Sequence, residues 1–331
     1  MPEIETPDGR EVFVVMNADS GRGGDDGPTP DDVRAEFARQ GAEIGMAILR
    51  SGDDLGDTVR AADAAGWPVI VAAGGDGTIC GVTEALIDGQ AVLGVLPLGT
   101  FNFFARSMAI PEDLSEAVGV ILNGRPEPAS LGEVNGRVFI NNASLGAYPA
   151  ILEERETVYR HWGRSRVAAY WSVLKAMLTI YKPLTMRITI DGEPYRAKSP
   201  MAFIGVRAYQ LDRFGIEGAD DIRDGRFAIL LAPDHGRFAL IWTALKVAMG
   251  GVREGQDFEL LTGCDILIET RRDNRRVARD GEHERMRQPY RFRFLKDAVR
   301  VMAPAVATID APVDEAQSVQ TQPVTGGIPA A

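Results

Sequence analysis

Residues 69–86 read VIVAAGGDGTICGVTEAL and decide the fold of the N-terminal half. The apolar run Val69–Ala73 predicts a buried strand, and Ile79–Asp88 has apolar residues at helical spacing. Between them, the glycines of Gly74–Thr78 (GGDGT) let backbone N–H groups approach phosphate oxygens, and Thr78 adds a hydroxyl. The segment is therefore typical of a phosphate-binding strand, turn and helix, although a tight turn without a ligand would use the same glycines.

The same alternation of strands and helices continues on both sides of this segment. Further strands are expected at Val12–Met16, Ile44–Leu49 and Val92–Leu96, and helices at Asp31–Gln40, Asp53–Ala65 and Glu112–Leu122. Short β-branched strands that alternate with helices predict a parallel sheet covered by helices. We therefore expect an α/β nucleotide-binding domain over residues 1–127.

Beyond Pro126 the pattern changes to strands joined by tight turns. Asn135-Gly136 and Asp191-Gly192 each lie between strand-like runs, which favours antiparallel hairpins. Further strands are expected at Pro200–Val206, Arg226–Leu231, Phe258–Leu261 and Ile266–Glu269, and helical insertions at Arg164–Tyr181 and Phe238–Met249. Residues 128–298 thus read as an antiparallel β-sandwich domain, and residues 312–331, which lack aromatics, as a disordered tail.

Composition and charge exclude several classes of protein. The 331 residues include 36 Lys plus Arg against 47 Asp plus Glu, and a net charge of -11 disfavours binding of nucleic acid. Cys80 and Cys264 are too few for a disulfide framework. The N-terminus has no basic and apolar signal pattern, and the apolar stretch 167–180 is too short to span a membrane. We therefore expect a cytoplasmic protein without nucleic-acid partners, and a homodimer is compatible with the sequence.

Three further motifs accompany the glycine-rich turn. Residues 17–21 (NADSG) follow the first expected strand, and residues 97–102 (PLGTFN) follow the fourth. The carboxyl ends of parallel strands meet at one edge of a sheet, so these loops can face a single nucleotide. Residues 280–282 (DGE) add two carboxylates near the end of the β-rich half.

At these motifs the chain resembles the diacylglycerol kinase and sphingosine kinase superfamily, particularly the bacterial lipid kinases. GGDGT and PLGTFNFFAR (97–106) carry most of the resemblance, NADSG and DGE complete it in the family's order, and GGDG also occurs in the more distant NAD kinases. The resemblance implies an α/β domain completed by residues 299–310 and a β-sandwich that binds the lipid. It also implies transfer of the γ-phosphoryl group of ATP, with Mg²⁺, to a lipid hydroxyl.

The resemblance also implies roles for individual residues. Nucleotide contacts are implied for Asn17, Ser20, Gly21, Gly74, Gly75, Asp76, Gly77, Thr78 and Thr100. Glu282 matches the general base of bacterial members and Asp76 that of sphingosine and NAD kinases, so the base is one of these two carboxylates. The Asp224 side chain, with the backbone carbonyls of Asp221 and Arg226, resembles a structural Mg²⁺ turn, for which an ordinary turn is the alternative.

Some positions depart from the family pattern, and several hypotheses about function stay open. Phe103 stands where the family usually has an aspartate, and Arg207 could contact an anionic headgroup or simply be solvated. The leading hypothesis is an ATP-dependent kinase of diacylglycerol or a related lipid, transiently associated with the membrane surface. The alternatives are a kinase of a soluble acceptor such as NAD, or a nucleotide-binding regulator that has lost catalysis, which Phe103 favours.

Overall fold

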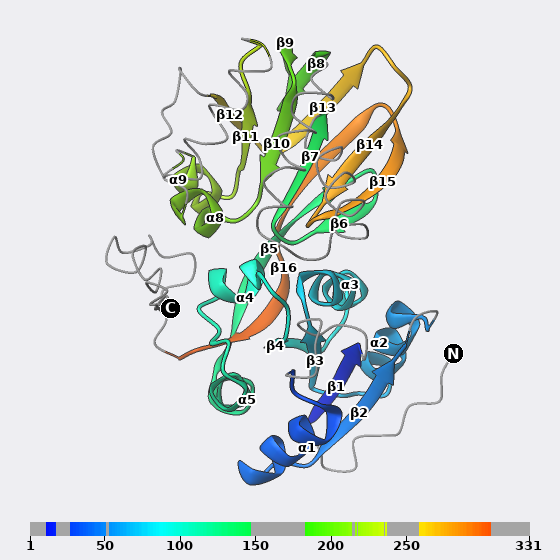
Figure 1. Ribbon diagram of the computed structural model, residues 1–331, viewed down its shortest axis with the longest axis vertical. Helices are drawn as coiled ribbons and strands as arrows, with labels where there is room; N and C mark the ends of the chain where they lie inside the picture. Colours follow the sequence, from blue (N-terminus) through cyan, green and yellow to red (C-terminus); the bar gives the residue numbers. More distant parts are fainter. Residues whose placement is uncertain are drawn as a thin grey trace, which may run out of the picture.

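The structure of the chain is a computed structural model that describes residues 11–17, 27–50, 53–146, 183–213, 216, 218–234, 236 and 258–305. Figure 1 shows an α/β part below and a β-rich part above. The helices expected at Arg164–Tyr181 and Phe238–Met249, and the tail at 312–331, lie outside the described residues.

Four parallel strands form the lower part of the molecule. β1 (Val12–Asn17), β2 (Ile44–Leu49), β3 (Val69–Gly74) and β4 (Val92–Pro97) lie in the order β2-β1-β3-β4. The helices α1 (Pro30–Arg39), α2 (Leu55–Ala64), α3 (Asp76–Leu86) and α5 (Leu114–Asn123) complete it. These elements confirm the predicted α/β class. Nearly all residues of β1, β3 and β4 are buried because both faces of the sheet are covered, whereas half of those in the edge strand β2 are not.

The helices of this part differ in how they begin. Thr29, Asp54 and Asp113 cap α1, α2 and α5 with their side chains. The N-cap of α3 is Gly75, so no side chain accepts a hydrogen bond from the first turn of this helix. The N–H groups at the start of α3 therefore have no side-chain cap to compete with an anionic ligand.

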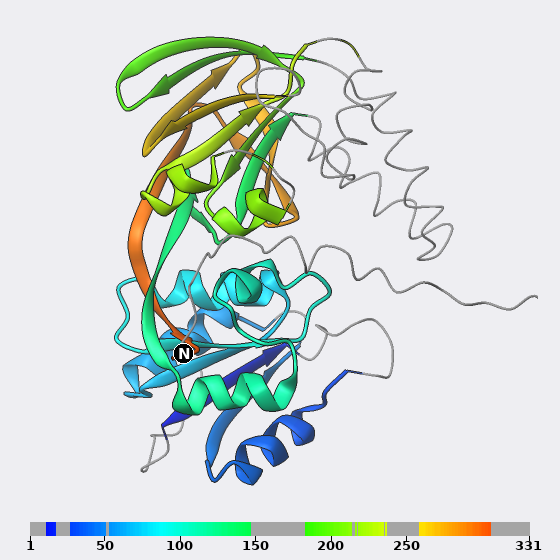
Figure 2. The same ribbon diagram turned by 90° about the vertical axis from the view of Figure 1, so that its left-hand side faces the viewer.

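A long strand joins the two parts of the molecule. β16 (Tyr290–Ala303) pairs in parallel with β4 through Val301 and Leu93, and antiparallel with β5 (Arg125–Val134) and β13 (Asp265–Thr270). Figure 2 shows this orange strand running from the upper part into the lower part. One ten-stranded sheet therefore extends through both parts, and the division into domains at residues 127 and 128 stays a prediction.

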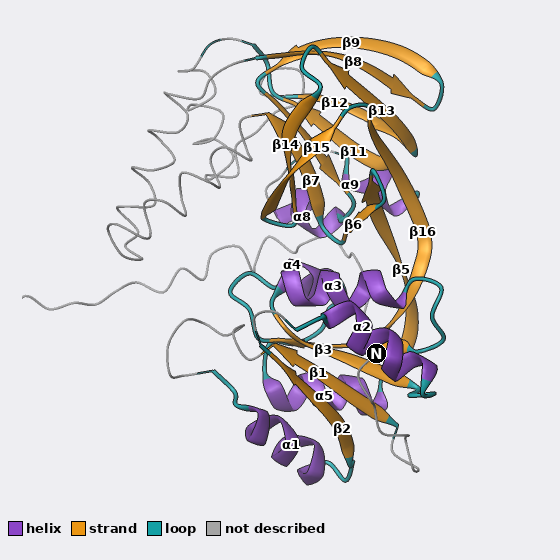
Figure 3. Cartoon of the chain, turned by 90° about the vertical axis from the view of Figure 1, so that its right-hand side faces the viewer, coloured by secondary structure: helices purple, strands orange, loops and turns teal. Residues whose placement is uncertain are grey.

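The upper part is a sandwich, as predicted (Figure 3). An antiparallel six-stranded sheet runs in the order β12 (Glu259–Gly263), β11 (Phe227–Leu231), β10 (Met201–Gly205), β7 (Asn142–Gly146), β14 (Asn274–Arg279) and β15 (Glu282–Arg287). The other layer is the upper part of the ten-stranded sheet, with β6 (Arg137–Phe139), β8 (Leu184–Ile190) and β9 (Glu193–Ser199). Phe139 packs between Phe227 and Phe292 in the core, with ring centroids 5.9 and 6.4 Å away.

Three short helices were not predicted, because five or six residues are too few to show helical periodicity. They are α4 (Phe103–Ser107), α8 (Ala208–Arg213) and α9 (Ala219–Arg223). α4 contacts α8, and both lie at the junction of the two parts (Figure 1). Within the described ranges, no helix combines the length and apolar character that a membrane crossing requires.

Candidate active site

The loops that follow β1, β3 and β4 emerge at one edge of the sheet. These strands are parallel neighbours and end at Asn17, Gly74 and Pro97. A Cβ atom on Gly99 would lie 2.6 Å from the Cα atom of Gly75, so the backbones of the second and third loops touch. The structure thus brings together the GGDGT and PLGTFN motifs, while Ser20 and Gly21 lie outside the described residues.

Asn102 holds the loop after β4 in place. It is buried in a left-handed conformation at φ 50°. Its Oδ1 accepts a hydrogen bond from the Gly99 N–H (3.0 Å), and its Nδ2 donates to Gly99 O (3.0 Å) and Glu112 Oε1 (3.2 Å). Thr100, at the tip of this loop, is exposed, whereas Thr78 in α3 is buried. Their roles in nucleotide binding stay predictions.

Asp76 is the first residue of α3, and its carboxylate caps a second helix. Oδ1 accepts hydrogen bonds from the Phe104 N–H (3.1 Å) and Asn141 Nδ2 (3.3 Å), and Oδ2 accepts one from the Phe103 N–H (3.3 Å). Asn102, the N-cap of α4, makes no side-chain capping bond itself. Residue 103 contacts Asp76 through its backbone N–H, a group that almost every residue type has. A phenylalanine at this position is therefore compatible with the hydrogen bonds of Asp76.

Glu282 faces the start of α3 from the upper part of the molecule. Its Oε1 lies 3.1 Å from the position that a Cβ atom on Gly77 would take. Glu282 begins β15 and is exposed, and no described residue donates a hydrogen bond to its carboxylate. The two candidate bases are therefore both at the N-terminus of α3, but Asp76 is engaged by three donors and Glu282 by none of the described residues.

The contact between Gly77 and Glu282 leads to a prediction for Gly77→Ala. The new methyl group would displace the carboxylate of Glu282, which is the flexible end of a side chain, so we expect normal folding and a fall of about tenfold in kcat. Gly119→Ala is the control, because its Cβ atom would make an ordinary contact of 3.6 Å with Gln40. Denaturant unfolding of both variants checks that they fold normally, and steady-state kinetics measure kcat. A kcat for Gly77→Ala equal to that of the wild type would contradict the prediction.

Asp280 was predicted only as part of the DGE motif, and the structure assigns it a separate position. It adopts a left-handed conformation at φ 47°, and its carboxylate accepts hydrogen bonds from three consecutive N–H groups, those of Ile140 (2.7 Å), Asn141 (2.8 Å) and Asn142 (3.1 Å). Burial raises the pKa of Asp280 to about 6, against the effect of these bonds, and the nearby charge of Asp76 adds to the increase.

Arg207 also binds this backbone segment, at the carbonyl of Ile140. The residue is buried; its guanidinium donates to Ile140 O and Ser130 O (both 2.9 Å) and lies 4.7 Å from the centroid of the Phe104 ring. Of the two alternatives for Arg207, solvation is therefore wrong, and contact with an anionic headgroup stays a prediction. Ile140 is therefore bound by both Asp280, at its N–H, and Arg207, at its carbonyl, and no sequence pattern marks partners so far apart in the chain.

Asn141 connects this segment to the glycine-rich loop. It is 2% exposed, its Nδ2 donates to Asp76, and its Oδ1 has no hydrogen-bond partner among the described residues. An unpaired buried acceptor lowers stability. The side chain of Asn141 therefore matters for the site through its bond to Asp76. This bond joins the glycine-rich loop to the segment of residues 140–142, which Asp280 anchors.

For Asn141→Leu we expect a loss of activity with little loss of stability. Leucine has the same number and branching of non-hydrogen side-chain atoms and removes the unpaired oxygen, so the free energy of unfolding should change by less than about 1.5 kcal/mol. Without the bond to Asp76, kcat should fall about tenfold. Denaturant unfolding and steady-state kinetics measure the two effects separately, and an unchanged kcat would contradict the prediction.

The predicted metal turn follows α9. The carbonyl of Asp221 accepts a hydrogen bond from the Arg226 N–H (3.0 Å), Gly225 has φ 85°, and Asp224 is exposed. In the part of the chain that the structure describes, no three or more His, Cys, Asp or Glu residues are grouped to hold a metal ion. A Mg²⁺ ion here would rely on one carboxylate, backbone carbonyls and water, which are suitable ligands, and this site stays a prediction.

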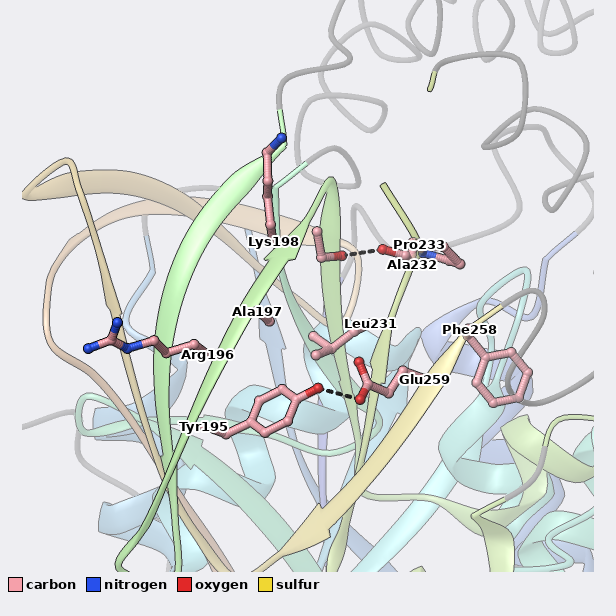
Figure 4. Close-up of a pocket in the computed structure, with 10 residues that line it drawn as sticks. Tyr195, Arg196, Ala197, Lys198, Leu231, Ala232, Pro233, Phe258 and Glu259 are labelled. Atoms are coloured by element: carbon pink, nitrogen blue, oxygen red, sulfur yellow. Dashed lines mark hydrogen bonds between the residues drawn. The ribbon is translucent and has the colours of Figure 1, made fainter. Parts of the chain in front are cut away.

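A cavity of about 430 Å³ opens elsewhere, between β9 and the strands β11 and β12 (Figure 4). Tyr195 donates a hydrogen bond to Glu259, which raises the pKa of the tyrosine to about 12, and Ser199 Oγ donates to Ala232 O at 2.7 Å. None of the predicted site residues lines this cavity, and these polar groups satisfy one another. The junction between Asp76 and Glu282 is therefore the better candidate site.

Comparisons with known proteins identify relatives of this chain. Residues 11–134 match the sequence profile of the diacylglycerol kinase catalytic domain. Residues 11–134 therefore form a domain of the diacylglycerol kinase catalytic family. It is 32% identical over 203 residues to a diacylglycerol kinase of Bacillus subtilis, covering 60% of this chain and 66% of that protein. It is 42% identical over 121 residues to a probable lipid kinase YegS-like of Pseudomonas aeruginosa, covering 35% of this chain and 40% of that protein.

The fold is similar to that of solved structures over nearly the whole chain. A crystal structure of a diacylglycerol kinase from Bacillus anthracis superposes with a TM-score of 0.67 at 20% identity, covering 92% of this chain and 98% of that one. The sequence matches, in contrast, span just under two thirds and two fifths of the two relatives' lengths. The sequence similarity to the Bacillus subtilis kinase therefore covers 60% of the chain, whereas the similarity of fold covers 92%.

Proposed function

We propose that this chain is an ATP-dependent lipid kinase that transfers the γ-phosphoryl group to the hydroxyl of diacylglycerol or a related lipid alcohol. Its family and its relatives named as diacylglycerol or lipid kinases support this proposal. The observation that carries it is the approach of the Glu282 carboxylate to Gly77, at a helix start with no side-chain cap. A carboxylate next to a phosphate-binding helix terminus is what phosphoryl transfer to an alcohol requires.

Three groups of the site act in the proposed reaction. N–H groups at the start of α3 bind phosphate oxygens, helped by the helix dipole. The acceptor oxygen bonds to the γ-phosphorus, the bond from that phosphorus to the oxygen of the leaving ADP breaks, and Glu282 takes the hydroxyl proton. Asp76, whose oxygens already accept three hydrogen bonds, orients the loop and α4.

Mg²⁺ fits the donor set of this site. Asp76 and Glu282 supply carboxylate oxygens at the start of α3, and Mg²⁺ commonly binds one or two carboxylates together with substrate phosphates. When bound, the ion would neutralise charge on the phosphates.

The proposal is tested by incubating the purified full chain with γ-32P-labelled ATP, Mg²⁺ and separate acceptors: diacylglycerol, monoacylglycerol, ceramide, NAD and glycerol. We expect label in a lipid alcohol. Label in NAD or glycerol alone would establish the soluble-acceptor alternative. ATP binding by calorimetry without labelling of any acceptor would establish the regulatory one, and either result would overturn the proposal.

A further inference from the structure

Two stacked aromatic rings lie where the loop after β4 enters α4, with Phe101 exposed and Phe103 partly buried. Phe101 is 49% exposed, and in the described part of the chain the other large apolar side chain with comparable exposure is Ile48, at 43%. The rings of Phe101 and Phe103 are stacked, with centroids 5.7 Å apart and planes 1° from parallel. The two rings together therefore present an apolar surface on an acidic protein.

This aromatic pair is directly attached to the candidate active site. The N–H of Phe103 donates to Asp76 Oδ2 at 3.3 Å, and the N–H of Phe104 donates to Oδ1 at 3.1 Å. Asn102, between the two rings in sequence, is buried and fixed by its bonds to Gly99. The pair is thus presented by a well-anchored segment, and a molecule that reacts at the start of α3, where Asp76 and Glu282 lie, comes close to it.

We infer that Phe101 and Phe103 bind the hydrocarbon chain of the acceptor, close to its reacting hydroxyl. This inference rests on the proposed function and extends it to a specific binding surface. The phosphates of the nucleotide need N–H groups and charge, which the start of α3 provides. A stacked, half-exposed aromatic surface instead favours apolar groups, because their contact with it removes both from water.

The test uses Phe101→Ser, the conservative variant Phe101→Trp, and Ile48→Ser on the edge strand β2 as a matched control. Dihexanoyl- and dioctanoylglycerol are supplied below their critical micelle concentrations, so that no lipid surface is present. For Phe101→Ser we expect kcat/KM with dioctanoylglycerol to fall about tenfold, mainly through KM, as the loss of the exposed half of a phenylalanine contact predicts. Phe101→Trp and Ile48→Ser should keep at least half of the wild-type value.

Binding measurements distinguish a contact with the acceptor chain from stacking on adenine and from docking to a membrane surface. Dioctanoylglycerol binding without nucleotide, measured by calorimetry, should weaken in Phe101→Ser, while its Kd for ATP stays within twofold of the wild type. Weaker ATP binding with unchanged acceptor binding would mean that the rings stack on adenine, and would overturn the inference. Weaker flotation with phosphatidylcholine–phosphatidylglycerol vesicles but an unchanged KM for the monomeric acceptor would also overturn it. If the wild type labels no lipid, the proposed function fails, while the nucleotide-free binding measurement still decides the inference.

Discussion

Glu282→Gln is expected to lower kcat by about 10³-fold, within the range typical of losing a general base. The amide keeps the size of the side chain and its place beside Gly77, so the fold and the Kd for ATP should change little. The exposed carboxylate makes no hydrogen bond with a described residue that the substitution would break. The measurement is the single-turnover rate of lipid phosphorylation at saturating ATP, together with calorimetry of ATP binding.

Two comparison variants sharpen this result. Glu193→Gln removes another exposed carboxylate at the start of β9, and it should leave the rate unchanged. Asp76→Asn replaces one carboxylate oxygen, an acceptor, with an NH2 group, a donor, although the neighbouring Phe103, Phe104 and Asn141 all donate to this side chain. It should therefore lower both the rate of lipid phosphorylation and the free energy of unfolding. If Glu282→Gln keeps the wild-type rate while Asp76→Asn abolishes it without unfolding, Asp76 is the base and Glu282 is not.

The parts of the fold that the sequence predicted are those with local signals. Val12–Asn17, Val69–Gly74 and Val92–Pro97 are continuous apolar runs that end at glycine-rich or polar loops. Because parallel strands end at one edge of a sheet, the order of strands and helices was enough to predict that the GGDGT and PLGTFN loops lie together. The contact between the backbones of Gly75 and Gly99 confirms this prediction.

The parts that the sequence did not predict depend on contacts between distant residues. Asp280 accepts hydrogen bonds from N–H groups about 140 residues earlier in the chain, and Arg207 donates to carbonyls 67 and 77 residues away. Neither contact leaves a periodic or spaced pattern. β16 was predicted only in its last part, although residues 290–294 alternate aromatic and charged side chains as a strand does. The register shift with β5 lies beyond this stretch, between Leu295 and Val299, so a local signal was present there and was missed.

The second large effect is a dependence of stability on pH that originates at Asp280. Its pKa is about 6 in the folded protein and 3.8 as the ordinary value, so the folded state binds the proton more tightly than the unfolded state. The stabilisation from this proton is complete below about pH 4 and is lost as the pH rises through 6. The shift corresponds to about 3 kcal/mol in total, of which about 2 kcal/mol should be lost between pH 4.5 and 7.

Activity should change with pH in the opposite direction, because the ionised carboxylate is the form that accepts hydrogen bonds from Ile140, Asn141 and Asn142. Since Asn141 holds Asp76, we expect kcat to rise as the pH passes 6 while the free energy of unfolding falls.

Urea unfolding of the wild type and of Asp280→Asn between pH 4.5 and 7 isolates the contribution of the Asp280 carboxyl to stability, since the amide does not titrate. Carbon-13 NMR of the Asp280 carboxyl in the wild type reports its pKa even if the variant does not fold, and a value near 4 would contradict both expectations. With a value near 6, the protein is less stable at neutral pH than in acid, but the charge of Asp280 then holds Asn141, which binds Asp76.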